Sequence, residues 1–237
     1  MRLPITVPFY DGETPASAAS RLARANGADK AWRFCLDMGL SLQDVVNGDT
    51  AALDRLSDLG GFDRDTLGAW ALVRGREAFY LRGQTLRSSV LMRIHAFACP
   101  RCLQGDMADT RVDPMVRPNG RAIWQIASIR TCFEHGVALE ECRVPKDDSG
   151  VTHDFPATME PYRPTIADDA ANASERMPSA FETYLRERLV HGTGGVAWLD
   201  ALPFYAAMTT CEVMGAVARH GPKVHLKTLE DYAMWDS

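Results

Sequence analysis

Cys99-Pro-Arg-Cys102-Leu-Gln-Gly-Asp106 is the stretch that decides how the middle of this chain folds. A second stretch, Thr131-Cys132-Phe-Glu-His135, follows after a segment with proline and glycine turns. In each stretch, two side chains that can bind metal are separated by two residues, a spacing that lets both turn toward one point. A disulfide, a redox centre and a metal site all use spaced cysteines, so the pattern raises three alternatives.

The composition favours a metal site. The chain has 237 residues, of which 46% are hydrophobic and 24% charged, as in an ordinary globular protein. The N-terminus lacks the apolar core of a signal peptide, and no apolar run is long enough to span a membrane, so we expect a cytoplasmic protein without membrane contact. Six cysteines are far fewer than a secreted disulfide scaffold carries.

We therefore predict a structural Zn²⁺ site made by Cys99, Cys102, Cys132 and His135. A disulfide or redox pair would need an oxidising compartment or a βαβ context, which the sequence around Cys99 does not indicate. Catalytic zinc would need an open coordination position and a general base, and the H-E-x-x-H pattern is absent. Cys142 remains a spare candidate ligand.

Charge is distributed unevenly along the chain. The net charge is −5, yet residues 74–143 carry 11 basic and 7 acidic side chains, and every one of these bases is an arginine. Acidic residues exceed basic ones in both flanking parts. Two interpretations stay open, chance clustering and a surface that meets phosphate. For the second, we name Arg82, Arg87, Arg93 and Arg101 as candidate phosphate contacts, which could instead pair with Asp106, Asp109 and Asp113.

The predicted fold is mainly α with a small β and zinc-knuckle module. Residues 1–78 form a helix-turn-helix-like domain with five short helices between 17 and 73, whose capping residues are expected at Ser17, Asp29, Ser41, Asp49 or Thr50, and Asp63. Residues 79–145 form the zinc module, with a strand expected at 121–131 from its alternating pattern. The proline-rich and acidic stretch 146–178 is expected to be a linker, and 179–237 a C-terminal helical domain.

One helical corner has the order of a helix-turn-helix. A helix carrying Leu53 and Leu56 meets the Gly60-Gly61 turn, and a second helix starts at Asp63. The second helix would offer Arg64 and Thr66 to a DNA groove. A purely structural corner of a bundle is the alternative, because the acidic side chains beside Arg64 would approach phosphates.

The remaining candidate side chains do not form a catalytic set. Cys35 and Cys211 lie in apolar helical contexts and are expected to fill the core. His95 and His153 have no partner at catalytic spacing, and the nucleophile and phosphate-loop motifs are absent. We expect a protein that is not an enzyme.

These residues resemble the TniQ family over about residues 1–145. The resemblance rests on the two knuckles, the Arg–Trp pair before the second knuckle and several N-terminal positions: Leu3-Pro4, Pro8, Glu13, Ser20-Arg21-Leu22-Ala23, Phe34-Cys35, Gly39, Gly48-Asp49, Leu53, Leu81-Arg82-Gly83, Cys99-Pro100, Cys102-Leu103, Asp106, Arg121, Trp124, Cys132, His135-Gly136 and Leu139.

The resemblance implies an accessory protein of DNA transposition rather than the transposase. It implies a targeting adaptor that meets target DNA or a targeting complex, including RNA-guided complexes, and contacts an AAA+ transposition regulator. It also implies a possible homodimer. A sequence-specific DNA-binding transcriptional regulator with a structural zinc site is the alternative, and a metal-dependent enzyme ranks last.

Overall fold

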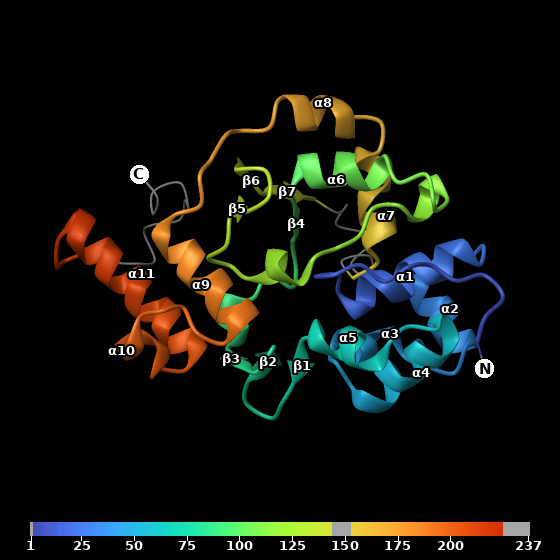
Figure 1. Cartoon of the computed structure of the whole chain (residues 1–237), viewed down its shortest axis with the longest axis horizontal. Helices are drawn as coiled ribbons and strands as arrows, with labels where there is room; N and C mark the ends of the chain where they lie inside the picture. The colour runs from blue at the N-terminus through green and yellow to red at the C-terminus, as the bar shows by residue number, and fades with distance from the viewer. Residues whose placement is uncertain (1, 144–152, 225–237) are drawn as a thin grey trace.

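The computed structural model describes residues 2–143 and 153–224 (Figure 1). Its α-helices are α1 Pro15–Ala25, α2 Ala31–Asp37, α3 Leu42–Val46, α4 Thr50–Gly60, α5 Arg64–Ala69, α6 Pro100–Met107, α7 Phe155–Met159, α8 Ile166–Ala171, α9 Ala180–His191, α10 Ala197–Asp200 and α11 Phe204–His220. Its strands are β1 Val73–Arg74, β2 Phe79–Leu81, β3 Gln84–Leu86, β4 Ala96–Ala98, β5 Thr131–Cys132, β6 Val137–Ala138 and β7 Glu140–Cys142. Short 3₁₀ turns are η1 Ser88–Val90, η2 Pro114–Val116, η3 Ala122–Gln125 and η4 Glu160–Tyr162. The prediction of a mainly α protein with small β elements is confirmed.

Helices α1 to α5 form the N-terminal bundle, as the spacing of leucines and caps predicts. Helix α1 lies at its centre, where Ala18, Ala19 and Leu22 are fully buried. The side chains of Ser41, Asp49 and Asp63 cap α3, α4 and α5 by accepting a backbone N–H, as expected. The first two helices begin elsewhere than predicted, and the capping side chain of α1 belongs to Thr14 rather than to Ser17.

A buried ion pair joins α1 to the segment before it. The side chains of Glu13 and Arg21 are both fully buried, and Arg21 Nη1 lies 2.9 Å from Glu13 Oε2. Arg21 also donates from Nε to the carbonyl of Val116 and from Nη1 to that of Pro8. One guanidinium therefore holds three chain segments together.

Three small antiparallel sheets follow the bundle. Strands β1, β2 and β3 form one sheet, β4 pairs with β7, and β5 pairs with β6. In the three-stranded sheet, Phe79 and Leu86 face the core and lie opposite each other, whereas Tyr80 faces solvent. The C-terminal helix α11 packs against β3, and its Phe204 and Met208 are buried in the same cluster.

The predicted strand at 121–131 is wrong over most of its length. Residues Ala122–Gln125 form the 3₁₀ turn η3, and β5 contains only the last predicted residue together with Cys132. The alternating pattern does not separate a buried face from a solvent face, because Trp124, Ile126 and Ile129 are all buried. The turn sends Trp124 into the cluster around the cysteines and Ile126 into the cluster around Leu86.

The predicted linker is also corrected for residues 153–178, because this part folds into α7, η4 and α8. Phe155, Met159 and Ile166 are buried against the central module. Helix α8 packs on α6, and α7 packs on α1 (Figure 1). Two of the prolines that suggested a spacer, Pro156 and Pro161, sit at the starts of α7 and η4, where a missing N–H costs nothing. Residues 146–152 lie outside the described part.

The C-terminal helices begin as the sequence indicates. Ser179 caps α9 and forms a capping box with Glu182. Arg188 of α9 donates to the carbonyls of Leu199 and Leu202, which fixes the loop before α11. The domain boundaries at 78, 145 and 178 stay predictions. Within the described part, no helix combines the length and apolar character that a bilayer span requires.

Removing one member of the Glu13–Arg21 pair is expected to destabilise the chain strongly. Arg21→Met leaves a buried carboxylate without its cation, and such losses cost about 3–5 kcal/mol. We expect this loss in urea unfolding of the zinc-loaded protein. The double variant Glu13→Gln/Arg21→Met should lose less than the two single variants added together. Strict additivity would show that the two side chains do not depend on each other.

Candidate metal centre

The structure brings Cys99, Cys102, Cys132 and His135 to one point. Their ligand atoms, three Sγ and the Nδ1 of His135, all lie within 4.8 Å of one another. The three cysteines are buried and the histidine is half-buried. These are the four residues that the sequence predicts as ligands.

The distances match a tetrahedral zinc site. The Nδ1 of His135 lies 3.7, 3.4 and 3.5 Å from the sulfurs of Cys99, Cys102 and Cys132. The Cys102 and Cys132 sulfurs are 3.6 Å apart. With Zn–S bonds of about 2.3 Å and Zn–N bonds of about 2.0 Å, a tetrahedron separates two sulfurs by about 3.8 Å and sulfur from nitrogen by about 3.6 Å. The donor set therefore fits Zn²⁺ in size and chemistry.

Local structure on both sides of the cluster presents the ligands. Cys99 is the N-cap of α6, and its Sγ accepts the backbone N–H of Cys102 at 3.4 Å. Cys132 ends β5, and His135 stands in the turn to β6. Gly136 closes that turn with a φ of 59°, a left-handed value that glycine adopts without strain, and donates to the Cys132 carbonyl.

The three thiols of the cluster shift one another's pKa in opposite directions. Hydrogen bonds with Cys132 and Cys99, together with burial, raise the pKa of Cys102, and the pKa of Cys99 is raised as well. Hydrogen bonds from Cys102 and Cys99 lower the pKa of Cys132, and a contact with His135 adds to the effect. Ionised sulfur is the form that binds a metal. Arg101 donates from Nη1 to the carbonyl of His135, so the ligand-bearing turn is tied to α6 through a second contact.

The competing interpretations of the cysteines do not fit this geometry. A sulfur–sulfur separation of 3.6 Å between Cys102 and Cys132 is far from the 2.05 Å of a disulfide bond, and all six cysteines are free. Cys142 lies outside the ligand cluster and is buried on β7. Glu134 is exposed, and its Oε2 approaches Cys102 Sγ to 3.4 Å. Four ligands complete the tetrahedron without it.

A salt bridge not predicted from the sequence supports α6. Arg121 Nη2 lies 3.0 Å from Asp106 Oδ1, and its guanidinium stacks on Trp124 at 4.7 Å from the ring centre. From the sequence, Asp106 is a possible partner of four other arginines. The Arg–Trp spacing before the second knuckle is the signal that could have found the bridge.

Three of the predicted phosphate-contacting arginines make hydrogen bonds within the fold. Arg82 donates to the carbonyls of Leu189 and Val190 and stacks on Trp70. Arg101 pairs with Glu175. Arg93 donates to Asn47 Oδ1.

The other three predicted contacts are exposed. Arg64 holds Asp54 and Asp58 of the preceding helix, and Thr66 donates its hydroxyl to Asp63. Arg87 stacks on the ring of Tyr205. The nucleic-acid role of all six residues stays a prediction.

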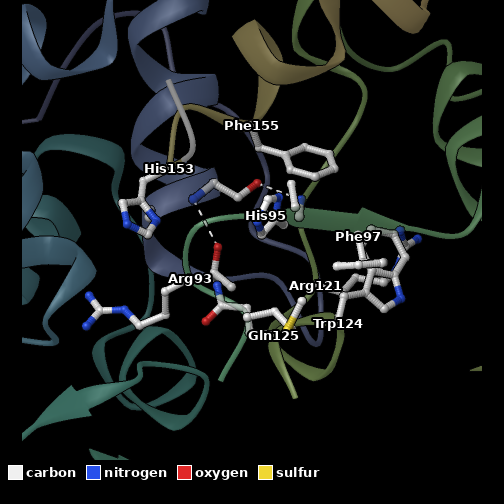
Figure 2. A pocket seen from close by; sticks show the side chains of 14 residues that line it. Arg93, His95, Phe97, Arg121, Trp124, Gln125, His153 and Phe155 are labelled. Atoms are coloured by element: carbon white, nitrogen blue, oxygen red, sulfur yellow. Dashed lines mark hydrogen bonds between the residues drawn. The ribbon is translucent and has the colours of Figure 1, made fainter. Parts of the chain in front are cut away.

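The pocket in Figure 2 is small. It has a volume of about 50 Å³ and lies between α1, η3 and β4, with His95, His153 and Phe155 in its wall. This is room for a water molecule or two rather than for a larger ligand. His95 pairs with Glu141, and burial, with a contribution from the Arg93 charge, lowers the pKa of His153 to about 4.

A comparison with protein families finds one match. The family model described as TniQ matches residues 4–139, which is more than half of the chain. The matched span contains the N-terminal bundle, the buried ion pair and all four candidate ligands. No curated protein matches the chain.

Replacing a ligand should remove the metal. Cys102→Ser is expected to lower the zinc content well below one ion per chain and to reduce the melting temperature, because a structural site loses affinity with its fourth ligand. Elemental analysis and thermal unfolding measure both effects. Cys142→Ser is the matched control, since it also changes a buried cysteine. Equal zinc loss in the two variants would contradict the assigned ligand set.

Stability should fall in mild acid partly through His153. Its pKa is depressed in the folded chain, so below about pH 6.5 the unfolded chain binds more protons and folding weakens until pH about 4. Between pH 7.5 and 5, we expect this residue to account for at most about 2 kcal/mol. His153→Gln should lose less stability than the parent chain over that range, in urea unfolding with excess zinc. Zinc release in acid lowers the stability of the parent and of the variant alike, so it does not account for a difference between them. Identical pH profiles would refute the prediction.

Proposed function

Because the chain belongs to the TniQ family, we propose that it is a non-catalytic accessory protein of DNA transposition. In this proposal it is a zinc-stabilised targeting adaptor that recruits or positions the transposition machinery at target DNA. The observation that carries the proposal is the family match over the part of the chain that holds the four-ligand cluster.

The zinc ion has a structural role in this proposal. Three sulfurs and one imidazole nitrogen fill a tetrahedron, which leaves no coordination position for a substrate. Structural zinc contributes about 10–16 kcal/mol of apparent binding free energy in small peptides. That contribution would stabilise a module whose strands are two or three residues long.

The proposed partners are target DNA or a targeting complex, and an AAA+ transposition regulator. Arginines exceed acids in residues 74–143, which supports contact with a polyanion. The acidic N- and C-terminal parts suit contact with protein. Self-association into a homodimer and a cytoplasmic location belong to the same proposal.

A sequence-specific DNA-binding regulator is the second candidate function. The α4–α5 corner favours it, because the two helices pack together and Gly61 turns between them with a φ of 68°. Two features weigh against it. Arg64 is held by acids of α4, and α5 has six residues with Asp63 and Asp65 at its start.

Capture of a partner separates the two candidates. We expect the zinc-loaded chain to retain the AAA+ regulator of the element that carries it, in a pull-down with purified proteins. Arg64→Gln/Thr66→Ala should leave this capture unchanged. If the chain retains no AAA+ protein, and the double variant abolishes binding to one specific duplex, the regulator function replaces the adaptor.

A further inference from the structure

The segment around the three-stranded sheet is rich in unbalanced positive charge. Residues 66–105 contain six arginines and a single carboxylate, Glu77. Arg82 and Arg101 are held by backbone carbonyls, and Arg101 also by Glu175. The four others are Arg74, Arg76, Arg87 and Arg93.

The register of the sheet brings three of these to the same end. Arg74 lies opposite Phe79, and Phe79 opposite Leu86, so these residues form one row across β1, β2 and β3. At this end of the sheet, β1 leads into the turn that contains Gly75 and Arg76. The N–H of Gly75 closes this turn by donating to the Ala78 carbonyl at 2.8 Å. At the same end, Arg87 follows the last residue of β3. The turn with Arg82 lies at the opposite end.

Arg93 approaches this end from the following segment. Its guanidinium lies 4.8 Å from the ring centre of Phe79, the middle residue of that row. Burial lowers the pKa of Arg93, and the charge of Arg74 lowers it further. Figure 2 shows the Arg93 side chain extending away from the pocket, on the side opposite Phe97 and Trp124. We refer to Arg74, Arg76, Arg87 and Arg93 as the arginine end of the sheet.

None of these four arginines forms an ion pair within residues 2–143 and 153–224. Three other arginines with solvent contact do form ion pairs: Arg111 holds Asp109, Arg143 holds Glu141, and the half-buried Arg186 holds Glu187. Arg74, Arg76 and Arg87 are exposed, so their guanidinium groups can meet a partner. Glu77, in the turn between β1 and β2, is the one carboxylate of this segment at the same end, so positive charge remains in excess there. Like charges in excess repel each other, and an external polyanion would relieve that repulsion.

We propose that the arginine end of the β1–β2–β3 sheet binds the phosphate backbone of duplex DNA. This inference rests on the proposed function, in which the chain acts at target DNA. Three strands span about 10 Å, and a duplex carries one negative charge per about 1.7 Å of its axis, so several phosphates face a surface of this width. Guanidinium groups donate two parallel hydrogen bonds to a phosphate.

The arginine end of the sheet differs from the set of arginines that the sequence indicates as phosphate contacts. It keeps Arg87 and Arg93 and adds Arg74 and Arg76. It leaves out Arg82 and Arg101, whose guanidinium groups donate to backbone carbonyls away from this end of the sheet. Arg93 is kept because it lies beside Phe79, although one of its donors bonds Asn47 Oδ1.

The salt dependence of DNA binding tests the proposal. In the zinc-loaded full chain, we expect the triple variant Arg74→Gln/Arg76→Gln/Arg87→Gln to reduce the slope of log K against log[KCl] by about two to three. The matched control Arg111→Gln/Arg143→Gln/Arg186→Gln removes the same charge and should reduce the slope by less than about one. The corresponding Arg→Lys triple at positions 74, 76 and 87 should keep the parent slope, and zinc content with melting temperature checks folding.

Two results would overturn the proposal. The first is an equal slope change in the test and control triples. The second is a test triple that binds duplex like the parent but no longer captures the AAA+ regulator, since this would assign the surface to a protein. DNA binding that depends on the arginine end without any capture of the regulator would leave this inference standing while the adaptor function fails. Conversely, capture of the regulator by a chain that binds no DNA would refute this inference and leave the proposed contact with the regulator standing.

Discussion

Four side chains converging on one tetrahedral position are the constraint on which the rest of this structure depends. They join the N-terminus of α6 to the β5–β6 turn, two places separated by an irregular stretch of chain. The strands involved contain two or three residues, too few to be stable by backbone pairing alone. In the proposed function, coordination of one ion would supply the missing free energy and fix the position of α6.

From α6, a continuous set of contacts reaches the N-terminal bundle. Asp106 of α6 holds Arg121, and the backbone of Arg121 bridges that of Glu13. Glu13 in turn forms the buried pair with Arg21 of α1. The metal-ligand cluster, the 3₁₀ turn and the bundle are therefore linked by two ion pairs and one backbone bridge rather than by a shared helix or long strand.

Local patterns in the sequence predict much of this. The ligands follow from two-residue spacing, and the caps at Ser41, Asp49 and Asp63 follow from side chains that compete for backbone N–H groups. Such local patterns do not predict features that depend on tertiary contacts. Residues around Trp124 alternate like a strand but are divided between two buried clusters. The stretch around Phe155 reads as a linker because it is rich in prolines and acids. In the structure Pro156 begins α7, which packs on α1, and α8 packs on α6.

The arginines, too, show the difference between what a local sequence pattern predicts and what tertiary contacts decide. Their number in the central segment is visible in the sequence, whereas their partners are not. Arg82 serves the end of α9, and Arg101 the carbonyl of a ligand. Arg74 and Arg87 form no ion pair within the described part, and the register of the three-stranded sheet places them at the same end.

X-ray absorption at the zinc edge tests the central claim most directly. For the zinc-loaded full chain, the account predicts a first shell of three sulfurs at about 2.3 Å and one imidazole nitrogen at about 2.0 Å. A shell dominated by oxygen or nitrogen, or protein that takes up no zinc at neutral pH, would contradict it.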